Sequence, residues 1–230
     1  MKLVLLPGLD GTGRLFSPLL DVLQSDFSPL IISYPADQFR SYAELSDYVR
    51  RQLPGAEDYV MLAESFSGPI AINLAADASP NLKALILCAT FVSNPLPFGL
   101  NLSFLVRDWE FSVSAPEFLV RKFLIGQDAP QALWQAFRAT LRTVAPKVLA
   151  ARTRSLPRVD VREAFGRCRA PILYLAAKQD KLLKRSSLDE MRDIKPEMEV
   201  VEIDGPHLLL QRNPTECLKA IDQFVKRALS

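Results

Sequence analysis

VMLAESFSGP, residues 60–69, joins a short apolar run to a segment of helical character at a serine. The run has the length and composition of a buried strand, and the change of character falls at Ser65. A turn this tight needs small residues two positions before and two positions after the serine, and Ala63 and Ser67 stand there. The pattern predicts a nucleophile elbow, a strained strand-to-helix turn that lifts Ser65 Oγ clear of a sheet.

Two other interpretations of this stretch remain open. Ser67 is the competing nucleophile. The residue two positions after Ser67 is Pro69, which fits the turn less well than the serine two positions after Ser65. Ser65 could also act only as a helix cap, a common role for serine. Ser65 is the favoured nucleophile, and Gly68 next to Ser67 still allows the helix to pack closely on the strand.

A serine hydroxyl needs a neighbouring base to take its proton. His207 is the only histidine in the chain, and it ends the turn DGPH, residues 204–207, directly after an expected strand. In an open parallel sheet the ligand site lies beyond the carboxyl ends of the strands, which places this imidazole over the elbow. A lone histidine is more often structural, but this position favours His207 as the base.

The third catalytic group should orient His207 and stabilise its charged form. Asp180 follows the expected strand 172–176 at a suitable distance. Two competitors remain: Asp204 is close to His207 in sequence but on the other side of its turn, and Asp160 lies near the end of the proline-rich segment described below. Asp180 is the favoured candidate.

The loop LPGLDGTG, residues 6–13, follows the first expected strand and supplies the expected oxyanion donors together with the elbow. The amides of Leu9 and Phe66 are the predicted donors, and each such donor lowers a barrier by about 3 kcal/mol. A phosphate-binding loop is the alternative, but neither G-x-G-x-x-G nor a P-loop lysine is present. Of the two acidic residues nearby, we interpret Asp10 as a turn residue and Glu64 as a residue that starts the helix.

Short apolar runs alternate with segments of helical period along most of the chain, which predicts a doubly wound, six-stranded, mostly parallel sheet. The expected strands are residues 2–6, 30–34, 59–63, 84–88, 172–176 and 199–203.

Residues 93–169 break this alternation, because they are rich in proline and contain helical segments without a strand. We expect an inserted helical cap over 93–169, with residues 1–92 and 170–230 forming the core. Most large apolar side chains of the cap should pack against the core, but as a group they exceed what that packing needs. We expect an apolar pocket beside the active site, in which the substrate-binding residues are Gly8, Asp10, Phe98, Phe104 and Trp109.

The composition excludes several classes of function. The 230 residues include 28 basic and 26 acidic side chains spread along the chain, so no field would concentrate nucleic acid or anionic lipid. Three cysteines without a CxxC pair and one histidine cannot assemble a zinc site and suggest a reducing compartment. The N-terminal apolar run is too short for a signal peptide or a membrane helix, so a cytoplasmic location is expected.

The chain resembles the α/β-hydrolase superfamily over nearly its whole length. Four features carry the resemblance: the loop 6–13, the elbow ESFSG at 64–68, the Asp180 loop and the His207 loop. Within the superfamily, PGLDGTG and ESF look like the esterase/lipase/thioesterase-type domains of plant phytyl ester synthases and their bacterial relatives. The resemblance implies the chain order Ser65, Asp180, His207 and acyl-enzyme chemistry without a metal or an organic cofactor.

Some positions depart from the superfamily pattern. Ala63 and Ser67 stand where the consensus has glycine, and Pro7 stands where many relatives have histidine. The first strand corresponds to the third strand of the superfamily, so the first two strands are expected to be missing from the sheet.

We therefore expect a serine hydrolase that cleaves carboxylic esters of apolar acyl groups through an acyl-enzyme. An acyl-thioesterase or an acyltransferase with the same triad remains an alternative, in which an acyl carrier could be a partner. A non-catalytic protein that binds a small ligand on the hydrolase fold is the alternative from another class, because a fold alone does not guarantee catalysis.

Overall fold

A parallel sheet forms the centre of the molecule. The computed structural model describes residues 1–23, 26–95 and 116–229. Its six strands lie in the order β2-β1-β3-β4-β5-β6, and every neighbouring pair is parallel. The strands are β1 (Lys2–Leu6), β2 (Ser28–Ile31), β3 (Tyr59–Glu64), β4 (Leu82–Cys88), β5 (Ile172–Ala177) and β6 (Glu199–Ile203). The predicted six-stranded sheet is confirmed.

The second strand differs from its predicted bounds of 30–34 at both ends, because β2 begins at Ser28 and ends at Ile31. The neighbouring strand β1 ends at Leu6, and the amide of Ile32 donates the last bond of this pair, to the carbonyl of Leu5. Tyr34 then donates its amide to a carbonyl of the loop after β1. The apolar run therefore continues into the core after the sheet pairing has ended, which a sequence pattern does not distinguish from a longer strand.

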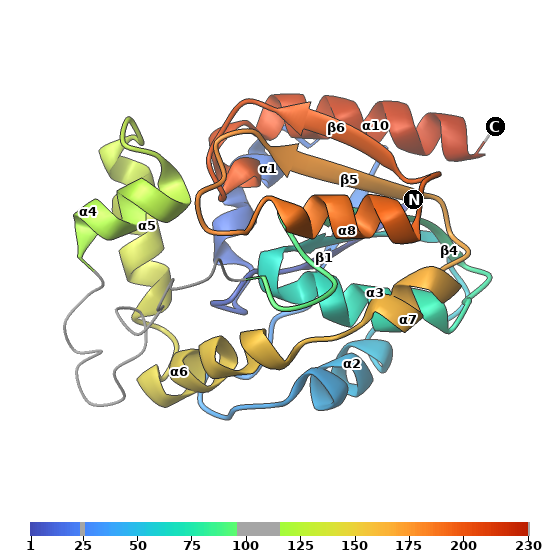
Figure 1. Ribbon diagram of the computed structural model, residues 1–230, viewed down its shortest axis with the longest axis horizontal. Coiled ribbons are helices and arrows are strands. Elements are labelled where there is room, and N and C mark those ends of the chain that lie inside the picture. The colour runs from blue at the N-terminus through green and yellow to red at the C-terminus, as the bar shows by residue number, and fades with distance from the viewer. Residues whose placement is uncertain (24–25, 96–115, 230) are drawn as a thin grey trace.

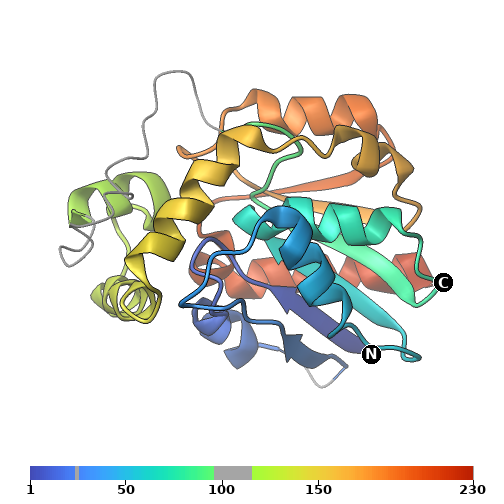
Figure 2. The same ribbon diagram turned by 90° about the horizontal axis from the view of Figure 1, so that it is seen from below.

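Helices cover both faces of the sheet (Figures 1 and 2). One face carries α1 (Ser17–Asp21), preceded by the turn η1 (Arg14–Phe16), together with α9 (Leu209–Arg212) and α10 (Pro214–Leu229). The other face carries α2 (Tyr42–Arg50), α3 (Gly68–Ala76), α7 (Arg162–Arg167) and α8 (Ser186–Ile194). The arrangement is the doubly wound one that the sequence predicts.

Burial of both faces explains the uninterrupted apolar strands. In β1, Leu3 and Leu5 pack into the cluster under α1 and α10, whereas Val4 and Leu6 pack into the cluster under α2 and α3. All four side chains are fully buried. Burying a leucine or valine side chain stabilises the fold by roughly 1.5–3 kcal/mol relative to exposure, so such runs fix both the strand and its place in the sheet.

Between β4 and β5, the described residues form helices and one isolated antiparallel bridge, between Ser93 and Asp160. The helical elements are α4 (Glu117–Val120), η4 (Arg121–Ile125), α5 (Gln131–Leu141), α6 (Pro146–Ser155), η5 (Leu156–Arg158) and α7. Figure 1 shows α4 and α5 beyond the carboxyl ends of β5 and β6, and Figure 2 shows α6 in yellow between them and the body. Because α7 packs with α3 and α8, only part of this segment overhangs the sheet. The division into a core and a cap at 93–169 stays a prediction.

No helix in the described ranges has the length and apolar character needed to cross a membrane.

Candidate functional site

The backbone at Ser65 adopts the left-handed conformation that a strained elbow requires. β3 ends at Glu64, Ser65 has φ 49°, and the turn η2 (Ser65–Ser67) leads directly into α3. A left-handed serine costs on the order of 1 kcal/mol or more and persists only when its surroundings hold it. Here Thr90 Oγ1 donates a hydrogen bond of 2.6 Å to the carbonyl oxygen of Ser65.

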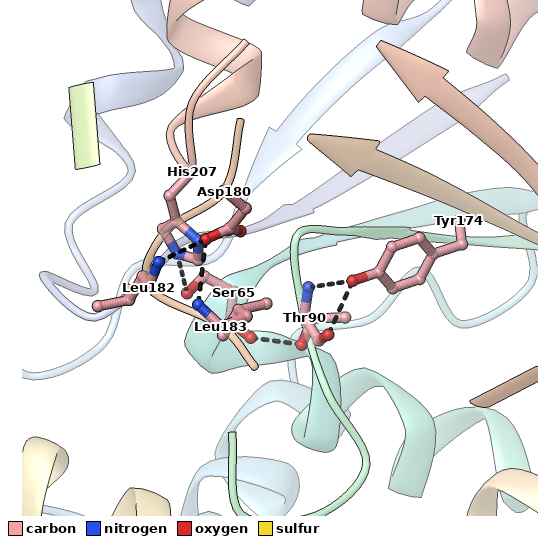
Figure 3. A network of polar contacts seen from close by, with 7 residues as sticks. All are labelled: Ser65, Thr90, Tyr174, Asp180, Leu182, Leu183 and His207. Atoms are coloured by element: carbon pink, nitrogen blue, oxygen red, sulfur yellow. Dashed lines mark hydrogen bonds and ion pairs between the residues drawn. The ribbon is translucent and has the colours of Figure 1, made fainter. Parts of the chain in front are cut away.

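Gly68 and Tyr174 keep Thr90 in place. A Cβ at Gly68 would lie 1.9 Å from Thr90 Oγ1, so only glycine lets the start of α3 approach this side chain. Tyr174 on β5 accepts a hydrogen bond from the amide of Thr90 at 3.1 Å and donates one to its carbonyl at 2.9 Å. Figure 3 shows this chain of contacts from β5 through Thr90 to the elbow. The elbow is thereby anchored to the far half of the sheet.

Ser65, His207 and Asp180 meet above the carboxyl ends of the strands (Figure 3). Ser65 Oγ lies 2.8 Å from His207 Nε2, and His207 Nδ1 lies 2.7 Å from Asp180 Oδ2. The other carboxylate oxygen of Asp180 accepts hydrogen bonds from the amides of Leu182 at 2.8 Å and Leu183 at 3.1 Å. The structure therefore brings together the three residues predicted for catalysis.

The environment of His207 favours proton acceptance. Burial by itself would lower the pKa of the buried imidazole, but the charge of Asp180, its hydrogen bond and the charge of Glu64 outweigh burial and raise the pKa. A raised pKa makes a stronger base, and the bond to Asp180 directs the Nδ1 proton away from Ser65 so that Nε2 can accept.

The competing serine is engaged elsewhere. Ser67 is fully buried, its hydroxyl donates to the carbonyl of Pro7, and it also lies 2.5 Å from the hydroxyl of Tyr34. The Ser67 side chain therefore connects the elbow to the loop after β1 and to the segment after β2, which is a structural role.

The competing aspartates also lie away from the imidazole. Asp204 is exposed and accepts a hydrogen bond from Gln179 Nε2 at 2.9 Å. Asp160 is exposed and forms an ion pair of 2.5 Å with Arg162. Asp180 is the aspartate that contacts His207.

The loop after β1 is a closed turn beside the elbow. The amide of Gly11 donates to the carbonyl of Gly8 at 3.0 Å, which leaves Leu9 and Asp10 as the central residues of the turn. Asp10 Oδ2 accepts from the amide of Thr12 at 2.8 Å and from its hydroxyl at 2.5 Å, as a turn aspartate does. Burial raises the pKa of Asp10, while the bonds from Thr12 work in the opposite direction.

An apolar cavity of about 80 Å³ opens beside Ser65 and His207. Gly8, Leu9, Asp10 and Phe66 all line it, so the predicted oxyanion donors and two of the predicted substrate-binding residues border one space. Leucine and phenylalanine side chains from the helical segment between β4 and β5 close its other side: Leu124, Phe137, Leu141, Leu149 and Leu156. The predicted substrate-binding residues Phe98, Phe104 and Trp109 lie outside the described residues.

Glu64 stands at the entry to the turn η2, as predicted, but its side chain has a further place in the site. It makes no side-chain cap at the start of the helix; it is the last residue of β3, is buried and lines the cavity. Gln211 Nε2 donates to Glu64 Oε2 at 3.3 Å, and burial raises the pKa of Glu64 to about 7. Glu64 is therefore both the last residue of β3 and the N-cap residue of η2. Its apolar neighbours on β3 are the signal that could have placed this carboxyl inside.

Arg152 is a buried residue of the site that sequence reasoning missed. It belongs to α6, is 1% exposed, and contacts the loop after β1. The available signal was its helical spacing: Val148, Leu149 and Leu156 lie on the same apolar stripe, so an arginine there points inward.

Within the described ranges no group of three or more histidine, cysteine, aspartate or glutamate side chains is placed to hold a metal ion. The three cysteines, Cys88, Cys168 and Cys217, are buried free thiols, and burial raises the pKa of each.

Comparisons with known proteins bear on the fold. A model of the alpha/beta hydrolase family matches residues 3–220. The esterase EaEST from Exiguobacterium antarcticum has a similar structure, with a TM-score of 0.84 at 15% identity over 98% of this chain and 92% of the esterase. MenH from S. aureus gives 0.79 at 18% identity over 100% and 95% of the two chains. A lipase-esterase related protein from Clostridium acetobutylicum gives 0.79 at 15% identity over 97% and 93%. No match was found among the curated proteins.

Proposed function

This chain belongs to the alpha/beta hydrolase family, and we propose that it is a serine hydrolase that cleaves carboxylic esters of apolar acyl groups. One observation carries the proposal: the hydrogen-bonded series Ser65, His207, Asp180 stands at the polar end of an apolar cavity. The similar structures of esterases support the fold on which such chemistry occurs, and the residues of this chain supply the rest of the argument.

In the proposed mechanism, Ser65 Oγ attacks the ester carbonyl carbon while its proton passes to His207 Nε2. The carbonyl oxygen becomes an oxyanion, held by the amides of Leu9 and Phe66. Collapse of this intermediate breaks the bond to the alcohol, which leaves with the proton from His207. Water, deprotonated by His207, then attacks the acyl-enzyme and releases the acid. Asp180 holds the imidazole in the tautomer that these transfers require.

The lining of the cavity suggests the substrate class. Leucine and phenylalanine side chains make up most of its wall, so it favours an apolar acyl group over a charged one. Asp10 and Glu64, the two carboxyl groups on the wall, would repel a carboxylate when they are ionised. An uncharged ester with an apolar acyl group fits both features.

The test combines covalent labelling with turnover. We expect the wild-type protein to react with a fluorophosphonate probe and to hydrolyse p-nitrophenyl esters of short to medium acyl chains. Ser65→Ala should abolish labelling and lower kcat by about 10⁶-fold, whereas the exposed control Ser186→Ala should match the wild type. Labelling that survives in Ser65→Ala, or a wild type that neither labels nor turns over, would overturn the proposal. A parallel series of acyl-thioesters tests whether the same triad prefers a thiol leaving group.

A further inference from the structure

Arg152 is an unusual side chain to find in the interior. Among the described residues it is the largest of the fully buried side chains, and it reaches from α6 to the loop after β1. Nη1 donates to the carbonyl of Leu9 at 3.0 Å and to the carbonyl of Asp10 at 2.7 Å, and Nη2 donates to the carbonyl of Pro35 at 2.9 Å. One guanidinium thus holds three backbone oxygens from two segments.

The contacts are specific to a guanidinium. Burial lowers the pKa of Arg152, while Tyr34 and Asp10 act in the opposite direction, so the buried charge is held at a cost in solvation. An apolar residue would join α6 to the body without that cost. Only the planar fork of arginine offers several donors in a fixed geometry, which is what carbonyls in two directions require.

The loop after β1 has a glycine where the Arg152 guanidinium packs against it. Gly11 has φ 71°, and a Cβ added to it would lie 2.5 Å from Arg152 Nη1. Gly11 therefore serves the turn conformation and the guanidinium at once. The glycine in the loop and the arginine in α6 therefore fit each other, although they lie more than 140 residues apart in the sequence.

We propose that Arg152 is a positioning residue of the oxyanion hole, through which the segment between β4 and β5 sets the direction of the Leu9 amide. The inference rests on the proposed function. The peptide unit that carries the Leu9 N–H also carries the Gly8 carbonyl, which accepts the bond from Gly11. The next peptide unit carries the Leu9 carbonyl, which Arg152 holds, so Leu9 is restrained on both sides. Without Arg152, the turn keeps its first restraint and loses the second.

A positioning role predicts a particular kinetic pattern. The oxyanion forms in the transition state and not in the bound ester, so a misdirected Leu9 amide should lower kcat and leave KM nearly unchanged. A displacement of this kind costs roughly 10- to 100-fold in rate. A purely structural tie would instead lower the fraction of folded enzyme and leave kcat per folded molecule unchanged.

The experiment measures kcat and KM per folded active site for Arg152→Met, Arg152→Lys and Gly11→Ala, with Arg158→Met as the exposed control. We expect kcat to fall about 10- to 100-fold in Arg152→Met and less in Arg152→Lys, which keeps the charge and one donor. Gly11→Ala should lower kcat by displacing the guanidinium. Adding Gly11→Ala to Arg152→Met should lower kcat little further, because the collision is already removed. In a further variant, Arg152→Ala, millimolar guanidinium should restore part of the lost kcat.

Gly13→Ala serves as the matched control for backbone strain. Gly13 has φ 73°, close to that of Gly11, but its Cβ would meet Ile31 and not Arg152. It should lose stability as Gly11→Ala does, with a smaller fall in kcat per folded molecule. Wild-type kcat in folded Arg152→Met, or equal losses of kcat in the two glycine variants, would overturn the inference. If Arg152→Met does not fold, the kcat values of Arg152→Lys and Gly11→Ala test the inference in its place. Failure of the wild type to label or to turn over would instead overturn the proposed function.

Discussion

The two walls of the cavity are built on different principles. The wall at the strand ends carries the polar groups, and hydrogen bonds fix each one: Thr90 holds the carbonyl of Ser65, and the amides of Leu182 and Leu183 hold Asp180. The opposite wall, from the segment between β4 and β5, presents mainly leucine and phenylalanine side chains held by packing. Hydrogen bonds fix the positions of the atoms they join to within a few tenths of an ångström, whereas apolar packing fixes mainly the volume and shape of the space between side chains.

This difference separates two kinds of requirement. Proton transfer between Ser65, His207 and Asp180 needs directional contacts, so we expect little tolerance to change at the strand ends. Selection of an acyl group needs only shape and volume, so we expect changes in the apolar wall to alter preference more than rate. Arg152 is the exception, because it carries directional contacts from the apolar side to the Leu9 carbonyl.

Apart from removal of Ser65 itself, the largest effect should follow from changing the directional contact at Asp180. Asp180→Asn keeps the size of the side chain but presents an amide to His207 Nδ1, which favours the tautomer with the proton on Nε2. That tautomer cannot accept the proton of Ser65, so kcat for an ester should fall about 10⁴-fold with little change in stability. Steady-state hydrolysis and thermal unfolding measure the two quantities.

Asp204→Asn is the matched control, since Asp204 is exposed and contacts Gln179. It should retain the wild-type kcat. If both variants behave alike, the assignment of Asp180 is wrong.

The next largest effect should come from the close approach under the elbow. In Gly68→Ala the new Cβ collides with Thr90, whose hydroxyl holds the strained carbonyl of Ser65. We expect a loss of about 1–3 kcal/mol in the free energy of unfolding and a fall in kcat, because overpacking forces the elbow to shift. Denaturant unfolding and ester hydrolysis on the same samples check both.

The control for this change lies in α7. Gly166 is also a helical glycine, but a Cβ there would approach Ile194 only to 3.8 Å, an ordinary contact. Gly166→Ala should be neutral or should stabilise the protein by up to about 1 kcal/mol. A Gly68→Ala variant as stable and as active as Gly166→Ala would show that the elbow does not depend on this approach.

The sequence predicts the parts of the molecule that rest on local pattern. Strands buried on both faces leave apolar runs such as residues 2–6 and 59–63, and these runs predict the six-stranded sheet. The elbow is predicted by the small residues around Ser65, and a single histidine makes His207 the natural candidate for the base.

What the sequence did not predict depends on contacts between distant segments. Glu64 accepts its hydrogen bond from Gln211, and Arg152 donates to the turn after β1. Both bounds of β2 were wrong because the extent of a strand is set by where its neighbour pairs with it, here from Lys2 to Leu5 of β1. A polar residue on an apolar stripe is a signal that something pairs with it, but the sequence does not say what.

A smaller effect is expected from the apolar wall. Leu141→Ala enlarges the cavity near the end of α5. We expect the ratio of kcat/KM for a longer acyl ester to kcat/KM for an acetyl ester to rise by about 10-fold. The kcat for the acetyl ester should stay nearly unchanged. Leu133 on the same helix lines an outer groove and not the cavity, so Leu133→Ala should leave the ratio at its wild-type value. A chain-length series of p-nitrophenyl esters measures it. An unchanged ratio in Leu141→Ala would argue against this wall as the acyl site.

The smallest effect concerns pH and the buried carboxyl on β3. The charge of Glu64 helps to raise the pKa of His207, and the imidazole must be neutral to act as base. Glu64→Gln removes that charge, so the acid limb of the kcat/KM profile should move to lower pH by less than about one unit. The shift is small because Asp180 contributes more to the pKa of His207 than Glu64 does.

Stability should change in the same variant with a definite sign. Burial raises the pKa of Glu64 from 4.5 to about 7, so the folded protein binds more protons than the unfolded chain between these values. The contribution of Glu64 to stability is therefore present below about pH 4.5 and is lost as pH rises through about 7. Glu64→Gln lacks this loss, so its Tm should rise relative to the wild type between about pH 5 and about pH 8. Glu57→Gln, at an exposed site, should show no such trend. A Tm difference that is independent of pH would mean that the pKa of Glu64 does not lie in this range and that burial has not raised it to about 7.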